Sequence, residues 1–402
     1  MSEALVIIGN GMAAARLVDE LAQVALGRYA IAVIGDEPRL AYSRVLLSSV
    51  LAGEATHEEI ELRPAAWWRD RGVTLKYGAT ANSIDMKARE VLTSTGKRVP
   101  FSKLVFATGS SALRLPVPGA DLSGVRTFRD SRDVDGLLEL AAQRKRVVVV
   151  GGGLLGLEAA YGLAKAGATV TLIHLMDRLM ERQLDADAAA LLKTLVERKS
   201  VTVLLEANTA NIYGNGRVEG VELKDGRRLA ADAVIFAAGI RPNTSLAKEA
   251  GVTVNRGIVV DDRMATGTPD IFALGECAEH RGTCYGLVEP AYEQAKVLAR
   301  NLADRSAAYE GSVLATNLKV SGVSVFSAGD FMAAEGSEIL LLNDIRRGIY
   351  KKLVIAEGKL TGAVLVGDTR DALWYLELIR NGASIDAIRA DMMFGRAFAE
   401  AA

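Results

Sequence analysis

The sequence predicts an α/β fold built from parallel sheets with helices on their faces, followed by an α+β module. A pattern of short apolar strand, glycine-rich turn, helix and second strand begins in "ALVIIG" and recurs from "RVVVVGGG". Each copy closes with a strand and a glycine, "LVFATG" and "AVIFAAG". Consecutive β-α-β units of this kind form parallel sheets. We therefore expect two Rossmann-like dinucleotide-binding domains, one inserted in the other.

The order of these patterns suggests where each domain begins and ends in the 402 residues. After Asn243 the chain returns to the first domain through "TPDIFALGE" and the helical "EPAYEQAKVLARNLA". From residue 313 it becomes strand-rich, with two apparent helices at the end. We predict a first dinucleotide-binding domain from residues 1–115 and 243–312, a second from 116–242, and a C-terminal α+β interface module from 313–402.

The first glycine turn follows the first strand and opens a helix. Gly9, Gly11 and Ala14 form G-x-G-x-x-A. The first glycine permits a tight turn, the second lets backbone approach a pyrophosphate, and the small third residue allows close packing of helix on strand. The helix N-terminus presents free N–H groups to the phosphates. Asp36 ends the next strand, where a carboxylate can accept hydrogen bonds from a ribose.

The second glycine turn repeats the motif with Gly151, Gly153 and Gly156. Two copies in the correct strand–helix context favour two bound dinucleotides over two structural turns. His174, not an acid, ends the second strand of this copy, so the choice between NADH and NADPH stays open. Arg178 and Arg182 lie nearby and would suit a 2′-phosphate, but exposed helix charges explain them equally well.

Composition excludes several classes of partner. The 48 basic and 49 acidic residues leave no basic surface for nucleic acid or an anionic membrane. The longest apolar run, residues 147–157, is too short to span a bilayer. Two cysteines cannot build a disulfide framework, which favours a reducing, cytoplasmic location.

Both cysteines lie in "GECAEHRGTC". Cys277, His280 and Cys284 have the spacing C-x2-H-x3-C, but no fourth ligand follows nearby unless a carboxylate serves. A metal or thiol site is therefore weighed against a strand-to-helix connection that passes a cofactor. We favour the connection and expect no metal, since free cysteines are often buried and inert.

The whole set of motifs resembles a known family. The series G-x-G-x-x-A, "ATG", G-x-G-x-x-G, "AAGIRPN" and "TPDIFALGE" resembles the FAD-dependent pyridine nucleotide-disulfide oxidoreductases. Within them, "YSRVLLSSVLAGE", "LMDRLMERQLD", "NRGIVVDD" and "LKVSGVSVFSAGDF" resemble the N-terminal FAD- and NAD(P)H-binding part of the assimilatory NAD(P)H nitrite reductase large subunit.

Two departures from the family refine the expected activity. Two cysteines cannot ligate the iron–sulfur and sirohaem centres that the full subunit carries. In addition, "YSRVLLSSV" lacks the reactive cysteine of the disulfide reductases and the lysine of ferredoxin reductases; Arg44 is a candidate for part of the lysine's role. The resemblance thus implies an electron-entry subunit that serves a separate iron–sulfur or haem protein. A rubredoxin or ferredoxin reductase, an NAD(P)H oxidase and a redox sensor remain alternatives, as does a homodimer.

The resemblance also implies which domain and which residues hold each cofactor: FAD belongs to the FAD-binding domain of residues 1–115 and 243–312, and NADH or NADPH to the NAD(P)H-binding domain of residues 116–242. The predicted cofactor-binding residues are Gly9, Gly11, Met12, Ala13, Ala14, Asp36, Glu37, Arg44, Thr108, Gly109, Arg129, Gly151, Gly153, Leu154, Leu155, Gly156, Glu158, His174, Gly239, Gly275, Glu276, Glu289 and Pro290.

Specific roles follow for several of these residues. Glu276 stands where the family usually has an aspartate for the ribityl chain, and a helix beginning near Glu289 or Pro290 would stabilise the reduced ring. Arg129 would contact the flavin nucleotide, unless it is a surface arginine at a helix start. Glu158 is the predicted catalytic residue, positioning the nicotinamide, although a glutamate near a helix start is also favoured by the dipole.

Overall fold

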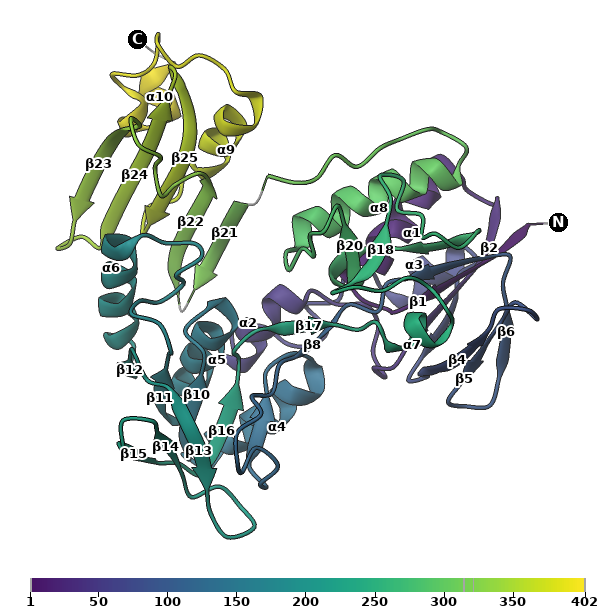
Figure 1. Ribbon diagram of the computed structural model, residues 1–402, viewed down its shortest axis with the longest axis horizontal. Coiled ribbons are helices and arrows are strands. Elements are labelled where there is room, and N and C mark those ends of the chain that lie inside the picture. Colours follow the sequence, from purple (N-terminus) through teal and green to yellow (C-terminus); the bar gives the residue numbers. More distant parts are fainter. Residues whose placement is uncertain (1, 314, 321, 401–402) are drawn as a thin grey trace. The chain divides into compact units, whose positions relative to one another are not determined.

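The computed structural model describes residues 2–313, 315–320 and 322–400, so residues 314, 321, 401 and 402 of the expected C-terminal module lie outside it. The chain divides into two compact units (Figure 1). Unit 1 comprises residues 1–47, 55–111 and 240–312, and unit 2 comprises 48–54, 112–239 and 313–402. The predicted three-domain boundaries remain a prediction; the two units divide within a few residues of the boundaries at 115 and 242.

Unit 1 is built on a five-stranded parallel sheet whose apolar runs the sequence predicted. In spatial order its strands are β19 (Ile271–Ala273), β7 (Lys103–Phe106), β1 (Glu3–Ile8), β2 (Tyr29–Gly35) and β3 (Thr74–Tyr77). Helices α1 (Met12–Val24) and α8 (Val288–Leu302) pack together beside it (Figure 1). The last four residues of β1 and the last three of β7 are buried, so the carboxyl ends of these two strands lie in the core of unit 1.

Smaller elements complete unit 1. They are the short helices α3 (Ala65–Asp70) and α7 (Ser245–Glu249), the 3₁₀ turns η1 (Arg44–Leu46) and η2 (Gly275–Cys277), the antiparallel strands β4 (Ala81–Asp85), β5 (Glu90–Thr93) and β6 (Arg98–Pro100), and the parallel pair β18 (Ile258–Val260) and β20 (Ala278–His280). A two-stranded pair joins β17 (Ile240–Pro242) to β8 (Ser110–Ala112), at the two points where the chain passes between the units.

Unit 2 contains the second parallel sheet. Its strands, in spatial order, are β12 (Val201–Leu204), β11 (Thr169–Ile173), β10 (Arg146–Val150), β16 (Ala233–Phe236) and β9 (Val125–Thr127). Its other elements are α2 (Leu47–Leu51), α4 (Ser131–Ala142), α5 (Leu154–Lys165), α6 (Ala186–Glu197), and the antiparallel strands β13 (Thr209–Tyr213), β14 (Gly220–Leu223) and β15 (Arg228–Ala230). The fold class predicted for both repeats is therefore confirmed.

The C-terminal module is an antiparallel sheet with helices, as predicted. Its strand order is β21 (Ala315–Val320), β22 (Val323–Gly329), β25 (Lys359–Val366), β24 (Ile349–Ala356) and β23 (Glu338–Asp344). Helices α9 (Ala372–Asn381) and α10 (Arg396–Ala399) and the turn η3 (Met392–Phe394) follow. Phe326, Leu353 and Leu365 of the sheet share a core with Tyr375 of α9.

This sheet packs against the nucleotide-binding part of unit 2. Helix α6 contacts β22 and β25, and α5 contacts β21. Asp185, the N-cap of α6, accepts hydrogen bonds from the Tyr350 hydroxyl at 2.8 Å and from Lys352 Nζ at 3.0 Å. Because Lys352 is buried, this ion pair joins the two parts through a solvent-poor contact. Among the described residues, no helix is both long and apolar enough to cross a bilayer.

Candidate functional site

The first glycine turn leaves an open space at the start of α1. Gly9 has φ +115°, and a Cβ there would lie 2.0 Å from the Ala107 carbonyl oxygen, so only glycine fits. Gly11 is the N-cap of α1, and a Cβ built on it meets no atom within 4 Å. The backbone N–H groups of this turn therefore face space that a phosphate can enter. Ala14, the third small residue, is buried against the sheet.

The turn η2 packs directly against the start of this helix. A Cβ on Gly275, which has φ +79°, would lie 3.0 Å from the Cβ of Ala13. The Gly275 N–H donates to Gln294 Oε1 of α8 at 2.7 Å. Met12 and Ala13 are half-buried in the first turn of α1. Unit 1 thus brings together two predicted segments that lie more than 260 residues apart in the sequence.

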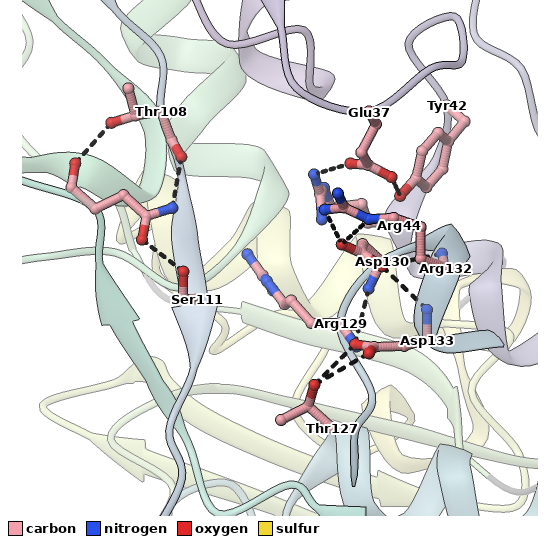
Figure 2. Close-up of polar contacts among 11 residues, drawn as sticks. Glu37, Tyr42, Arg44, Thr108, Ser111, Thr127, Arg129, Asp130, Arg132 and Asp133 are labelled. Atoms are coloured by element: carbon pink, nitrogen blue, oxygen red, sulfur yellow. Dashed lines mark hydrogen bonds and ion pairs between the residues drawn. The ribbon is translucent and has the colours of Figure 1, made fainter. Parts of the chain in front are cut away.

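The end of β2 carries two carboxylates in different surroundings, and Figure 2 shows the second of them, Glu37. Asp36 is exposed, whereas Glu37 is buried. The Tyr42 hydroxyl donates to Glu37 Oε2 at 2.6 Å, and Arg44 Nη2 donates to Glu37 Oε1 at 2.6 Å. This network fixes the loop that follows β2. The sequence identified Glu37 and Arg44 as site residues, but nothing in the motif indicated the role of Tyr42.

The "ATG" segment after β7 is held by an asparagine that the sequence analysis did not place in the site. Asn243 accepts a hydrogen bond from the Thr108 hydroxyl at 2.7 Å through its carbonyl oxygen, and its Nδ2 donates to the Thr108 carbonyl oxygen at 2.9 Å. Its Oδ1 accepts from the Ser111 hydroxyl at 2.7 Å; Thr108 and Ser111 are visible in Figure 2. The "IRPN" motif is thereby connected to "ATG", which is the signal that could have identified Asn243.

Glu276 lies beside the same segment. Its Oε2 accepts a hydrogen bond from the Ser110 hydroxyl at 2.8 Å and lies 3.9 Å from the position of a Cβ on Gly109. At the start of α8, Glu289 is exposed and Pro290 is buried. Unit 1 therefore places Thr108, Gly109 and Glu276 at the carboxyl ends of its parallel strands, which is where such sheets bind ligands.

Two of the three potential metal ligands of "GECAEHRGTC", Cys277 and His280, have other partners. Cys277 is fully buried, its thiol donates to the Leu274 carbonyl oxygen at 3.4 Å, and burial raises its pKa. His280 Nε2 lies 2.8 Å from Asp262 Oδ1. The Cys284 thiol, half-buried, also has a pKa raised by burial. Across the described residues, no three His, Cys, Asp or Glu side chains are grouped so that they could hold a metal ion.

The second glycine turn has the same geometry as the first. A Cβ on Gly151, at φ +123°, would lie 2.4 Å from the Ala237 carbonyl oxygen, and one on Gly156 would lie 1.8 Å from the Gly151 carbonyl oxygen. A Cβ on Gly153, the N-cap of α5, meets no atom within 4 Å. The first turn of α5 holds the half-buried Leu154 and Leu155, and Gly239 follows β16 with open space around it.

His174, at the end of β11, is directed back toward this turn. The Gly152 N–H donates to His174 Nδ1 at 3.0 Å, and His174 Nε2 lies 3.1 Å from Glu181 Oε2. Since Nδ1 accepts, the ring proton of the neutral imidazole is on Nε2, and Nε2 donates to Glu181. The ring is buried, and a Cβ on Gly152 would lie 2.6 Å from its Cγ. His174 is thus a structural support of the turn, and the sequence motif did not indicate Glu181.

Glu158 lies in α5, five residues after the N-cap, and is buried. Burial raises its pKa to about 8, while a hydrogen bond with the Ser48 side chain lowers it in part. The group is therefore mostly neutral at pH 7 and can donate a hydrogen bond. A neutral acid in an otherwise apolar helix is a candidate for a functional site.

Arg129 precedes α4 in unit 2. Its backbone N–H donates to Asp133 Oδ2 at 2.7 Å, and Asp130 and Asp133 form a capping box at the start of the helix. Thr127 also donates to Asp133 Oδ1, at 3.1 Å. Figure 2 shows the side chain of Arg129 pointing away from Asp133 and Thr127. The local fold therefore fixes the backbone of Arg129.

Comparison with known proteins identifies the two parts of the chain. Residues 3–297 match the family described as pyridine nucleotide-disulphide oxidoreductase, and residues 315–383 match the rubredoxin NAD+ reductase C-terminal domain. The chain is 47% identical over 382 residues to an NAD(P)H nitrite reductase of Bacillus subtilis, covering 95% of this chain and 48% of the relative. It is 44% identical to the assimilatory nitrate reductase electron transfer subunit of the same organism, covering 91% and 48%.

Among solved structures, the ferredoxin reductase for the CYP199A2 system from Rhodopseudomonas palustris is similar with a TM-score of 0.86 and 26% identity, covering 95% of this chain and 96% of that one. The chain thus spans about half the length of the two Bacillus relatives and nearly all of the ferredoxin reductase. The family match covers well over half of the chain and includes both glycine turns. The chain belongs to the pyridine nucleotide-disulphide oxidoreductase family.

Proposed function

We propose that the chain is an FAD-dependent NAD(P)H oxidoreductase, the electron-entry part of a nitrite- or nitrate-reducing system. The observation that carries this proposal is the pair of open glycine turns. In each unit, the second glycine of the motif is the N-cap of a helix with space where its Cβ would be. One dinucleotide per turn suits this arrangement, and the Bacillus relatives indicate the metabolic setting.

The residues of unit 1 are suited to FAD. Gly9, Gly11 and the N-terminus of α1 would receive the pyrophosphate, and Asp36 or Glu37 the adenosine ribose. Six buried side-chain atoms have no hydrogen-bond partner within the described part of the chain, and two of them lie at this site: Asn10 Oδ1 next to the glycine turn and Gln294 Nε2 next to Gly275. Buried polar atoms normally have partners, so these two support a polar group bound there.

The residues of unit 2 are suited to the nicotinamide nucleotide. Gly151, Gly153 and the N-terminus of α5 would hold its pyrophosphate. Glu158, mostly neutral at pH 7, would donate a hydrogen bond to an uncharged acceptor such as a carboxamide oxygen. We also assign Arg129, whose backbone N–H is held by the capping box of α4, to the flavin nucleotide, as the resemblance to the family implies.

The flavin, when bound, would accept a hydride from the nicotinamide and release electrons singly. The protein itself then needs no acid or nucleophile for that transfer; its residues hold the two nucleotides and exclude water. Cys277 is fully buried as a neutral thiol, which argues against a thiol relay.

We propose an iron–sulfur or haem protein as the electron acceptor. The C-terminal match to a rubredoxin reductase domain and the likeness to a ferredoxin reductase favour the iron–sulfur protein of these two, and they make a rubredoxin or ferredoxin reductase the second candidate function. Two free cysteines also support a cytoplasmic location. A homodimer and the absence of nucleic-acid binding stay predictions.

Anaerobic mixing tests the main proposal. The full chain is purified, incubated with FAD, freed of excess cofactor and titrated with NADH and NADPH while its visible absorbance is recorded. We expect bound FAD and loss of its visible absorbance with at least one of the two nucleotides. A protein that retains no FAD, or whose FAD keeps its absorbance, contradicts the proposal.

A panel of acceptors then separates the variants of the proposal. Rubredoxin, ferredoxin, a sirohaem nitrite reductase partner and oxygen are each offered to the reduced protein. Rapid turnover with an iron–sulfur or haem protein supports the electron-entry role, whereas turnover with oxygen alone indicates an oxidase. Tight nucleotide binding without turnover on any acceptor indicates a redox sensor.

A further inference from the structure

A carboxylate from the loop after β11, that of Glu181, lies next to the residue that follows the end of this strand, His174. In dinucleotide-binding folds an acid at this point bonds the ribose 2′-hydroxyl of NADH, and an arginine accommodates the 2′-phosphate of NADPH. Here His174 occupies the end of the strand, and both of its ring nitrogens are already engaged, one by the Gly152 N–H and one by Glu181. His174 therefore has no ring nitrogen left for a ribose.

Glu181 is held beside the glycine turn by its neighbours. Met180, at φ +50°, donates its backbone N–H to the Gly152 carbonyl oxygen at 3.0 Å, which anchors the loop after β11 to the turn. The Glu181 side chain is one-quarter exposed, and its Oε2 receives the His174 Nε2–H at 3.1 Å. A carboxylate with one bonded oxygen and partial access to solvent can still accept a hydrogen bond from a hydroxyl.

The basic residues nearby do not offset this negative charge. Arg178 Nη1 pairs with Asp177 Oδ1 at 3.1 Å, and Arg178 Nε is buried, so the guanidinium is partly neutralised and partly turned into the protein. Arg182 is exposed, and it forms no ion pair within the part of the chain that the structure describes.

Resting on the proposed function, we propose that Glu181 makes the nucleotide site in unit 2 selective for NADH over NADPH. The carboxylate accepts a hydrogen bond from the 2′-hydroxyl and repels a 2′-phosphate, with His174 acting as the positioning residue that connects it to the glycine turn. A single carboxylate, seven residues beyond His174, thus replaces the acid that this strand lacks.

The test measures binding without hydride transfer. ADP-ribose and 2′-phospho-ADP-ribose are titrated calorimetrically into the purified, FAD-treated full chain and into Glu181→Gln. The glutamine keeps an acceptor for His174 Nε2–H but removes the charge. We expect the wild type to bind ADP-ribose at least about tenfold more tightly, and E181Q to reduce that ratio to about threefold or less, mainly by tighter binding of the phosphorylated probe.

Glu139→Gln is the matched control. Glu139 is exposed in the last turn of α4, whose end lies near Gly167, at the opposite end of α5 from the glycine turn. The Glu139→Gln substitution changes the net charge by the same amount as Glu181→Gln, and it should leave the ratio of the two probe affinities unchanged. Equal unfolding temperatures of the three proteins exclude a folding effect.

Three results would overturn the inference: a wild type that prefers the phosphorylated probe, an E181Q ratio equal to that of the wild type, or an equal change in E139Q. Binding of neither probe would overturn it together with the nicotinamide site itself. Discrimination between the probes in a protein whose FAD is not reduced by NADH would support the inference while contradicting the proposed function.

Discussion

Asp185 Oδ2 lies 3.0 Å from Lys352 Nζ, although 167 residues separate them in the chain. The pair connects the N-terminus of α6 to β24 of the C-terminal sheet, and both side chains are largely buried. Breaking one member of a buried pair leaves the other as an uncompensated charge, which is far more costly than losing an exposed ion pair.

We therefore expect Asp185→Ala to lower the free energy of unfolding by about 3–5 kcal/mol, because it leaves Lys352 unpaired and removes the helix cap. Urea denaturation measures the change. Asp187→Ala, an exposed residue in the first turn of the same helix, should cost no more than about 1 kcal/mol. Similar losses in the two variants would show that the ion pair adds nothing.

The two glycines of the first turn should respond differently to alanine. Gly9→Ala forces a Cβ to within 2.0 Å of the Ala107 carbonyl oxygen at φ +115°, so it should cost at least about 2 kcal/mol of stability. Gly11→Ala has space for its Cβ and should change stability by less than about 1 kcal/mol. It should nevertheless weaken FAD binding at least about tenfold, because the methyl group occupies the space proposed for the pyrophosphate.

Thermal unfolding and the FAD content of the purified variants measure both effects. Normal FAD binding by Gly11→Ala would count against the position proposed for the flavin. Normal stability of Gly9→Ala would count against the contact with Ala107.

Glu158 should make stability depend on pH. Its pKa is about 8 in the folded protein against an ordinary value of 4.5, so between these pH values the folded state binds more protons than the unfolded state. Stability should therefore fall as pH rises through this window, by at most about 1.4 kcal/mol per unit from this one group. Glu158→Gln should remove that decline, whereas Glu139→Gln should retain it.

Denaturation curves recorded at pH 5, 7 and 9 would reveal the difference. The same E158Q variant should bind NADH with little change, since an amide also donates a hydrogen bond. Parallel pH profiles of the wild type and E158Q would show that Glu158 ionises normally in the folded protein.

The buried cysteine provides a test of the thiol alternative. Cys277→Ala removes a fully buried sulfur and should cost about 1–2 kcal/mol of stability through the cavity it leaves. NADH-driven bleaching of the bound FAD should be unaffected in this variant and in Cys284→Ala, because neither thiol takes part. Stopped-flow absorbance provides the rate, and a loss of more than about tenfold in a folded variant would support a thiol relay.

The local chemistry of the glycine turns made much of the fold predictable. The strand–helix junctions require either a positive φ, at Gly9 and Gly151, or an open N-cap, at Gly11 and Gly153. Both requirements select glycine at a fixed spacing, which can be recognised in the sequence. The role of His174 was not predictable in the same way. Its side chain bonds a backbone group 22 residues earlier and a carboxylate seven residues later, and no motif records such contacts.

Non-local contacts account for the other differences. Asn243 was read as a domain boundary, yet its three hydrogen bonds to Thr108 and Ser111 hold the "ATG" segment. The end of β2 offered two adjacent acids, and only the fold distinguishes the exposed Asp36 from Glu37, which is enclosed by Tyr42 and Arg44. Which of two adjacent side chains is buried depends on the face of the strand end that is turned to the interior, and a shift of one residue reverses the result.

The packing of α6 on the C-terminal sheet has a practical implication for protein engineering. A chimera that exchanges residues 313–402 alone would separate Tyr350 and Lys352 from Asp185 and expose the surface that α6 and α5 cover. An exchange that transfers residues 112–239 together with 313–402 keeps this interface intact. Swapping acceptor preference between relatives should therefore succeed as a two-segment graft.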